Sequence, residues 1–107
     1  MSQDTTYKAT VVYLGKDHGF VRLKDDIESR LKFEFNGWLL IVPGPNGPEF
    51  ASQEMTKEMG KLPRVSEGDM LIVTVIVSSG GHRKIGKWAH YYKWVEAEQA
   101  ITNAAKS

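Results

Sequence analysis

A series of short, strand-like segments, separated by turns rich in glycine and aspartate, limits the folds that this chain can adopt. The segments hold β-branched and aromatic residues, which favour strands, and residues 31–35 alternate between apolar and charged side chains. The predicted strands are residues 7–14, 18–24, 31–35, 38–42, 70–78 and 84–95. Asn36-Gly37 is the dipeptide best suited to a tight hairpin turn. The pattern predicts an all-β fold, a small antiparallel barrel.

A long connection separates the first predicted strands from the last pair. Its residues 43–48 hold three of the four prolines, which favour irregular structure over a strand. Residues 52–59 predict a short helix that Ser52 caps and Gly60 ends. Because a plain loop is rarely this long, we interpret residues 43–65 as a helix-bearing insertion. The alanine-rich tail, residues 96–107, is expected to be helical or frayed.

Length and composition favour a single domain, residues 1–107, with a core over about residues 7–95. The chain has no cysteine, which excludes disulfides and thiolate metal sites. No apolar run approaches the roughly 20 residues that cross a bilayer, and no secretory signal pattern is present. We therefore expect a cytoplasmic protein without membrane contact. The net charge of +1 gives little support for polyanion binding, so the distribution of charge must carry that argument.

Three short stretches resemble a known family. Residues 8–14 (KATVVYL), a turn and residues 18–21 (HGFV) resemble the opening of a cold-shock domain. That family has a Lys-Gly-x-Val-Lys-Trp-Phe strand followed by an RNA-binding motif, Lys-Gly-Phe-Gly-Phe-Ile. Residues 67–69 (EGD) resemble the family's Val-Gly-Asp turn before its fourth strand. The resemblance spans roughly residues 7–95, with few identical positions.

The resemblance implies a five-stranded antiparallel barrel of the oligonucleotide-binding (OB) type, here with one short helix in a long loop. Cold-shock domains bind single-stranded RNA or DNA by stacking bases on surface rings. Carried over by position, Tyr13, His18 and Phe20 would supply these rings, each a platform for a base. Gly19 between two of them would leave the strand surface open to a base.

The third predicted strand departs from the family pattern. Residues 31–35 place Lys32 and Glu34 where the family has outward stacking residues. The apolar positions of this strand, Leu31, Phe33 and Phe35, would then face the core. A glutamate on the binding face would repel phosphate. The first turn is also shorter than the family's, and the insertion is longer.

The last predicted strand interleaves rings with cations. Strand alternation would place Trp88, His90, Tyr92 and Trp94 on one face, a surface that suits nucleic acid. The alternative, that this row of rings fills the barrel, stays open for Trp88 and Trp94. Exposed cations would gather the phosphate backbone. The predicted nucleic-acid-binding residues are Lys8, Tyr13, Lys16, His18, Phe20, Arg22, Lys32, Arg83, Lys84, Lys87, Trp88 and Tyr92.

The strand at 70–78 has apolar residues on both faces. Alternation would turn Leu71, Val73, Val75 and Val77 toward the core and leave Met70, Ile72 and Ile76 outside. An outward apolar row needs a cover. The helix at 52–59, the tail or a second subunit could supply it, and we expect the cover to come from within the chain.

No pattern typical of an enzyme or metal site is present. The three histidines lack metal-ligand spacing, and residues 44–48 lack the phosphate-loop pattern. We expect no catalysis, metal or cofactor, and single-stranded RNA or DNA as the partner of a monomer or weak dimer. The alternative is an OB-fold protein–protein adaptor in a transcription or phage-encoded assembly. Near-neutral charge, Glu34 and the insertion favour that alternative.

Overall fold

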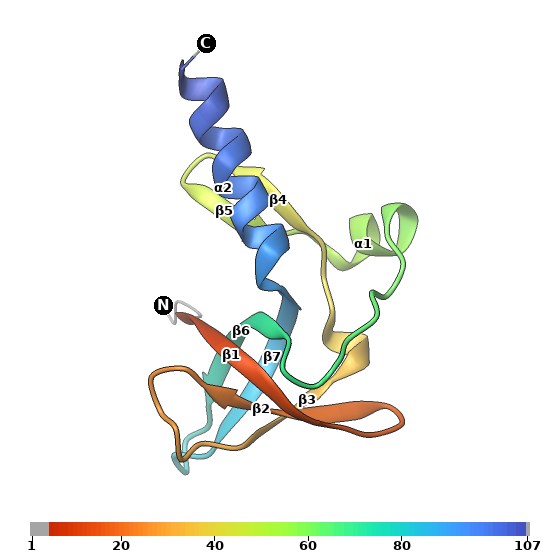
Figure 1. The fold of residues 1–107 in the computed structure, drawn as a ribbon, viewed down its shortest axis with the longest axis vertical. Helices are drawn as coiled ribbons and strands as arrows, with labels where there is room; N and C mark the ends of the chain where they lie inside the picture. The colour runs from red at the N-terminus through yellow and green to blue at the C-terminus, as the bar shows by residue number, and fades with distance from the viewer. Residues whose placement is uncertain (1–4, 107) are drawn as a thin grey trace.

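A five-stranded antiparallel sheet, curled into a nearly closed barrel, forms the body of the computed structural model, which describes residues 5–106 (Figure 1). Its strands are β1 (Thr5–Leu14), β2 (His18–Leu23), β3 (Leu31–Glu34), β6 (Met70–Val77) and β7 (Arg83–His90). They lie in the order β3-β2-β1-β6-β7, and each pairs antiparallel with its neighbours. This confirms the predicted fold class, and the strand order is compatible with an OB fold.

The two edge strands, β3 and β7, meet without a continuous ladder. The indole Nε1–H of Trp88 donates to the carbonyl of Glu34 at 2.8 Å, and the Leu39 N–H donates to the carbonyl of Trp88 at 3.1 Å. Among residues 5–106, one isolated β-bridge, between Trp38 and Trp88, pairs the chain after β3 with β7. The seam of the barrel therefore depends on Trp88 and the chain just after β3.

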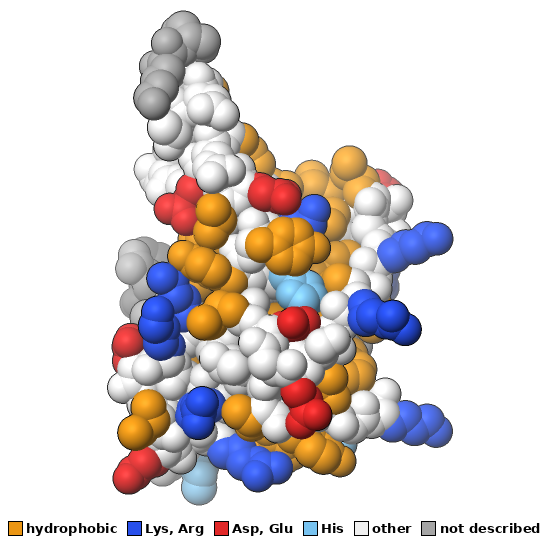
Figure 2. Space-filling model, in the orientation of Figure 1, with side chains coloured by type: hydrophobic (Ala, Val, Ile, Leu, Met, Phe, Trp, Pro, Cys, Tyr) orange, Lys and Arg blue, Asp and Glu red, His pale blue; other side chains and the backbone are white. Residues whose placement is uncertain are grey.

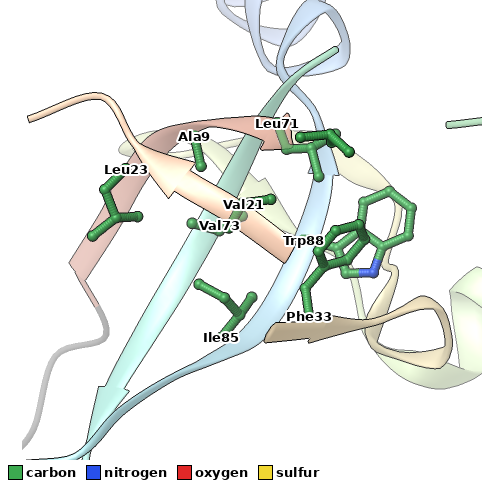
Figure 3. Close-up of a cluster of buried hydrophobic side chains, with 9 residues drawn as sticks. Ala9, Val21, Leu23, Phe33, Leu71, Val73, Ile85 and Trp88 are labelled. Carbon is green, nitrogen blue, oxygen red and sulfur yellow. The ribbon is translucent and has the colours of Figure 1, made fainter. Parts of the chain in front are cut away.

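Inward side chains of all five strands make one core (Figure 3). Trp88 and Phe33 are completely buried and meet edge to face, with ring centroids 5.3 Å apart. Leu31 and Phe35 are partly buried against this core, which confirms the predicted register of β3. The nine buried members are Ala9, Val11, Val21, Leu23, Phe33, Leu71, Val73, Ile85 and Trp88.

The predicted hairpin at Asn36-Gly37 is wrong. Neither residue has a positive φ, and the chain instead makes a short 3-10 helix, η1 (Phe35–Gly37). The Trp38 N–H donates to the carbonyl of Phe35, and the chain then runs to the barrel seam rather than back along β3. The physical reason is that Trp38 and Leu39 bond and pack against Trp88 of β7, contacts that a local hairpin would forfeit.

The proline-rich segment is also more regular than predicted. Strands β4 (Ile41–Gly44) and β5 (Gly47–Phe50) form a separate two-stranded hairpin in which Pro43 and Pro48 lie opposite each other. Both strands of such a ribbon are edges, where proline's missing N–H is tolerated. Gly47, with a φ of 128°, supplies the turn.

The predicted helix is confirmed as α1 (Gln53–Met59). The Ser52 hydroxyl accepts a hydrogen bond from the Met55 N–H at 3.1 Å, and Gly60 follows the last residue. The Thr56 hydroxyl accepts from the Leu40 N–H at 3.1 Å, which fastens α1 to the chain leading into β4. The insertion is therefore held together by a bond between α1 and the segment that precedes β4.

The last strand ends earlier than predicted. β7 stops at His90, and residues from Tyr91 on form the helix α2 (Tyr91–Lys106). Trp94, Ala97 and Ile101 recur at helical spacing and are buried or half-buried, so the apolar pattern suits a helix. α2 packs on β4, β5 and β6, with the Trp94 and Phe50 rings 6.0 Å apart. Within residues 5–106, no helix is long and apolar enough to span a membrane.

α2 gives β6 an internal cover over only part of its length. Ile72 and Thr74 on the outer face are buried, and α2 contacts this strand. Ile76 and Val77, beyond the reach of the cover, are exposed. Val77 was predicted to face the core. The prediction fails because Val77 lies two residues past Val75, where the pairing of β6 with β1 ends, so that within residues 5–106 it pairs with Arg83 of β7 alone.

Candidate nucleic-acid interface

Three rings gather on the outer face of the β1–β2 hairpin. The ring centroids of Tyr13 and Phe20 are 6.0 Å apart, those of His18 and Phe20 are 5.8 Å apart, and those of Tyr13 and His18 are 6.5 Å apart. Tyr13 is 44% exposed, and His18 and Phe20 are half-buried. We call these three side chains the ring platform. The structure thus brings together the three rings that the resemblance singled out.

A β-bulge puts Tyr13 on this face. Val11 points into the core, so unbroken alternation would turn Tyr13 inward as well. The register between β1 and β2 shifts at Val12, so that Val11 pairs with Val21 but Tyr13 pairs with Phe20. The extra residue reverses the direction of Tyr13 and sets its ring beside that of Phe20.

Gly19 has a different role from the one predicted. Its position faces inward, and an added Cβ would lie 2.7 Å from the Phe33 ring and 2.7 Å from the Tyr13 carbonyl oxygen. Glycine is needed here because the core ring of β3 crosses directly over the backbone. The residue opens space for Phe33 inside the barrel, not for a base outside.

Four cations lie around the platform. The Arg30 guanidinium carbon is 4.7 Å from the Phe20 ring centroid, and Lys32 pairs with Phe20 across β2 and β3. Arg22 follows Phe20 on the same face of β2, and Lys16 lies in the turn beside His18. All four are exposed. Arg30 was not among the predicted binding residues, although it lies two positions before Lys32 and therefore on the same outward side.

Two acidic residues lie at the turn end of the platform. His18 Nδ1 donates to the Asp17 carboxylate at 2.9 Å, and this bond holds the pKa of the Asp17 carboxyl below its ordinary value. Glu34 pairs with His18 across the strands and is exposed, as predicted. The Asp17 bond orients the His18 ring at the platform edge, while Glu34 makes that edge less favourable for phosphate.

The C-terminal rings do not join the platform. Trp88 was predicted to bind nucleic acid, but it is 0% exposed and lies in the core, so it offers no face to a base. Tyr92 is 52% exposed but lies on α2, next to His90, because the chain turns from strand to helix at Tyr91. The alternative in which a ring fills the barrel is therefore correct for Trp88.

The remaining predicted cations lie apart from the rings. The Lys8 ammonium lies 4.7 Å from the ring centroid of Tyr91, at the start of α2. Arg83 forms an ion pair with Asp26 at 3.2 Å, and Lys84 is the next residue of β7. Asp26 follows the C-terminal end of β2, whereas His18 begins that strand. Lys87 is exposed on β7. Figure 2 shows lysine and arginine side chains dispersed around the visible face rather than gathered in one patch.

A pocket of about 770 Å³ opens beside the platform. It lies between the β1–β2 turn, η1 and α1, which follow one another up one side of the molecule in Figure 1. His18 and Lys32 line it from the platform side, Lys16 from the turn, and Gln53 and Lys57 from α1. We call it the α1 pocket. No sequence pattern predicts this pocket, because its walls come from segments far apart in the chain.

Neither a metal site nor a match to a known protein identifies the function of the ring platform. Among residues 5–106, no group of three or more metal-ligating side chains is positioned to hold an ion. A comparison with protein-family models finds no match, and a comparison with curated proteins finds none either. The cold-shock resemblance therefore remains an interpretation of the residues quoted for it.

Proposed function

We propose that this protein binds single-stranded nucleic acid on the ring platform. The observation that carries the proposal is the outward clustering of Tyr13, His18 and Phe20, with centroids within 6.5 Å of one another. Every base has a π-face, and stacking on such rings contributes about 1–3 kcal/mol per base. A single strand exposes its base faces, whereas a duplex hides them.

The charges next to the rings support the same ligand. Arg22 of β2, Lys32 of β3 and Arg30, just before β3, surround Phe20, where they can contact the phosphates between stacked bases. Arg30 already lies over the Phe20 ring, and its planar guanidinium can continue a stack of bases. Because the net charge is only +1, stacking contributes more to this affinity than general attraction to a polyanion.

Removing one ring tests the proposal. Phe20→Ala is expected to weaken binding of a labelled single strand of about eight nucleotides by roughly 5- to 100-fold, measured by fluorescence anisotropy. Tyr92→Ala is the comparison, since it removes an exposed ring from α2, apart from the platform. It should leave the affinity unchanged. Thermal unfolding of both variants checks that the barrel remains folded.

Two outcomes would count against the platform. If Phe20→Ala binds as tightly as the unaltered chain, or if Tyr92→Ala loses as much, the strand does not lie on these rings. If the unaltered chain binds neither RNA nor DNA strands, the adaptor function is favoured. The observation behind that second candidate is the exposure of Met55, Met59 and Leu62 on and after α1, an apolar surface that fits a protein partner.

A further inference from the structure

The α1 pocket is continuous with the ring platform. His18, a ring of the platform, and Lys32, which pairs with Phe20, both line the pocket. A strand stacked on Tyr13 and Phe20 and extended past His18 would therefore reach the pocket mouth. At about 770 Å³ it falls within the range of sites that enclose drug-sized ligands, and a nucleotide is of that size.

The inner wall of the pocket is apolar. Phe35 and Trp38 are half-buried, Leu39 is buried, and all three line the cavity. A wall of this kind accepts a flat, largely apolar group such as a base and disfavours a free phosphate. The bulk of the ligand should therefore be a base and not the charged backbone.

Two amide side chains are available to recognise such a base. Asn36 of η1 and Gln53 of α1 line the pocket and are exposed, and within residues 5–106 their side-chain amides form no hydrogen bond. Thr56, which also lines it, is already engaged because its hydroxyl accepts from Leu40. Amides carry both a donor and an acceptor, so they can match the donor and acceptor pattern of a base edge.

The charges of the pocket suit the flanking phosphates. Lys16, Lys32 and Lys57 line it, against two carboxylates, those of Asp17 and Glu34. Asp17 accepts the hydrogen bond from His18, so its charge is partly compensated. The positive groups lie on the turn, β3 and α1, on different sides of the cavity, where the backbone of a bound nucleotide would pass.

We propose that the α1 pocket receives one unstacked nucleotide of the strand held on the ring platform, and that Asn36 and Gln53 select its base. This inference rests on the proposed function and adds to it a position of base preference. The platform holds any base, whereas the pocket discriminates among bases at the neighbouring position.

The test uses single strands of about eight nucleotides in which each of the four bases is placed in turn at one position, and this is repeated for each position of the strand. The unaltered chain should prefer one base at one position by about three- to tenfold, the discrimination expected from one or two hydrogen bonds. Gln53→Ala and Asn36→Ala should each reduce that preference, with little effect on strands too short to reach the pocket. Glu54→Ala, on an exposed position of α1 outside the pocket lining, is the matched control and should keep it.

The outcomes separate the pocket from the platform. If strands bind and Phe20→Ala weakens them, but no position shows a base preference, the pocket proposal is overturned and the platform stands. The same conclusion holds if the preference survives the Gln53→Ala, Asn36→Ala double variant. If no strand binds to the unaltered chain, both proposals fall together.

Discussion

At the residue scale, Trp88 is the side chain on which most of the barrel depends. It is completely buried, packs edge to face on Phe33, and donates its indole N–H across the seam to the Glu34 carbonyl. The same backbone position accepts from Leu39 and pairs with Trp38. One residue thus fills the core and joins the two edge strands.

Trp88→Phe should therefore destabilise the fold strongly. The change removes ring volume from the core and leaves the Glu34 carbonyl without its donor, so we expect a loss of about 2–4 kcal/mol in the free energy of unfolding. Urea denaturation measures this loss. Trp94→Phe, at a half-buried ring on α2, should cost about 1 kcal/mol or less, because no hydrogen bond is lost there. Equal losses for the two variants would show that the seam bond contributes nothing.

At the element scale, α1 forms one wall of the α1 pocket and depends on its cap. It has only seven residues, too few for a stable helix on their own, so the Ser52 hydroxyl and the Thr56 bond to Leu40 contribute much of its order. Loosening α1 would disturb the pocket without touching the platform strands.

Ser52→Ala should lower the local stability of α1 by about 1 kcal/mol, because the Met55 N–H loses its acceptor. Amide exchange at Met55 and Thr56 should accelerate by about fivefold. Ser52→Gly is the comparison, since glycine at a cap costs only a few tenths of a kcal/mol. Matching exchange rates for the alanine and glycine variants would mean that the cap is not what orders α1.

The elements also show how far the sequence could predict this molecule. Local patterns identified β1, β2, β3, β6 and α1, because alternation, turn residues and the Ser52 cap act over a few neighbouring residues. The predictions failed at residues 38–42 and 91–95, where a short apolar run is compatible with a strand and also with another kind of structure. There, contacts with distant segments decide: Trp88 draws Trp38 to the seam, and Phe50 packs on Trp94.

In the candidate site, too, some features could be predicted from the sequence and others depend on contacts between distant segments. The rings of the platform were predicted because a resemblance fixed their positions, and the bulge at Val12 that turns Tyr13 outward leaves no mark in the alternation. The exclusion of Trp88 and the pocket between the turn and α1 depend on tertiary packing. No local pattern encodes them.

At the scale of the whole molecule, the dispersed charge predicts a shallow dependence of binding on salt. Of the four cations around the platform, three surround Phe20 (Arg22, Arg30 and Lys32), so a strand of about four nucleotides that contacts these three should give a slope of log K against log salt near −2. Lys32→Ala should reduce the magnitude of that slope by about 0.7. Lys93→Ala, which removes a cation of α2 paired with Glu96, should leave it unchanged. A much steeper slope would indicate a binding path over the rest of the barrel.

The platform and the insertion are encoded in separate stretches of the chain. All three rings belong to a single hairpin, whereas η1 and α1 belong to the connection between β3 and β6. Apart from Phe35, Trp38 and Leu39, which pack on the core or close the seam, residues 35–62 can therefore change without moving the hairpin. Under the proposed function, the hairpin would hold a strand in the same way in every such variant, while changes in the connection would alter the base preference.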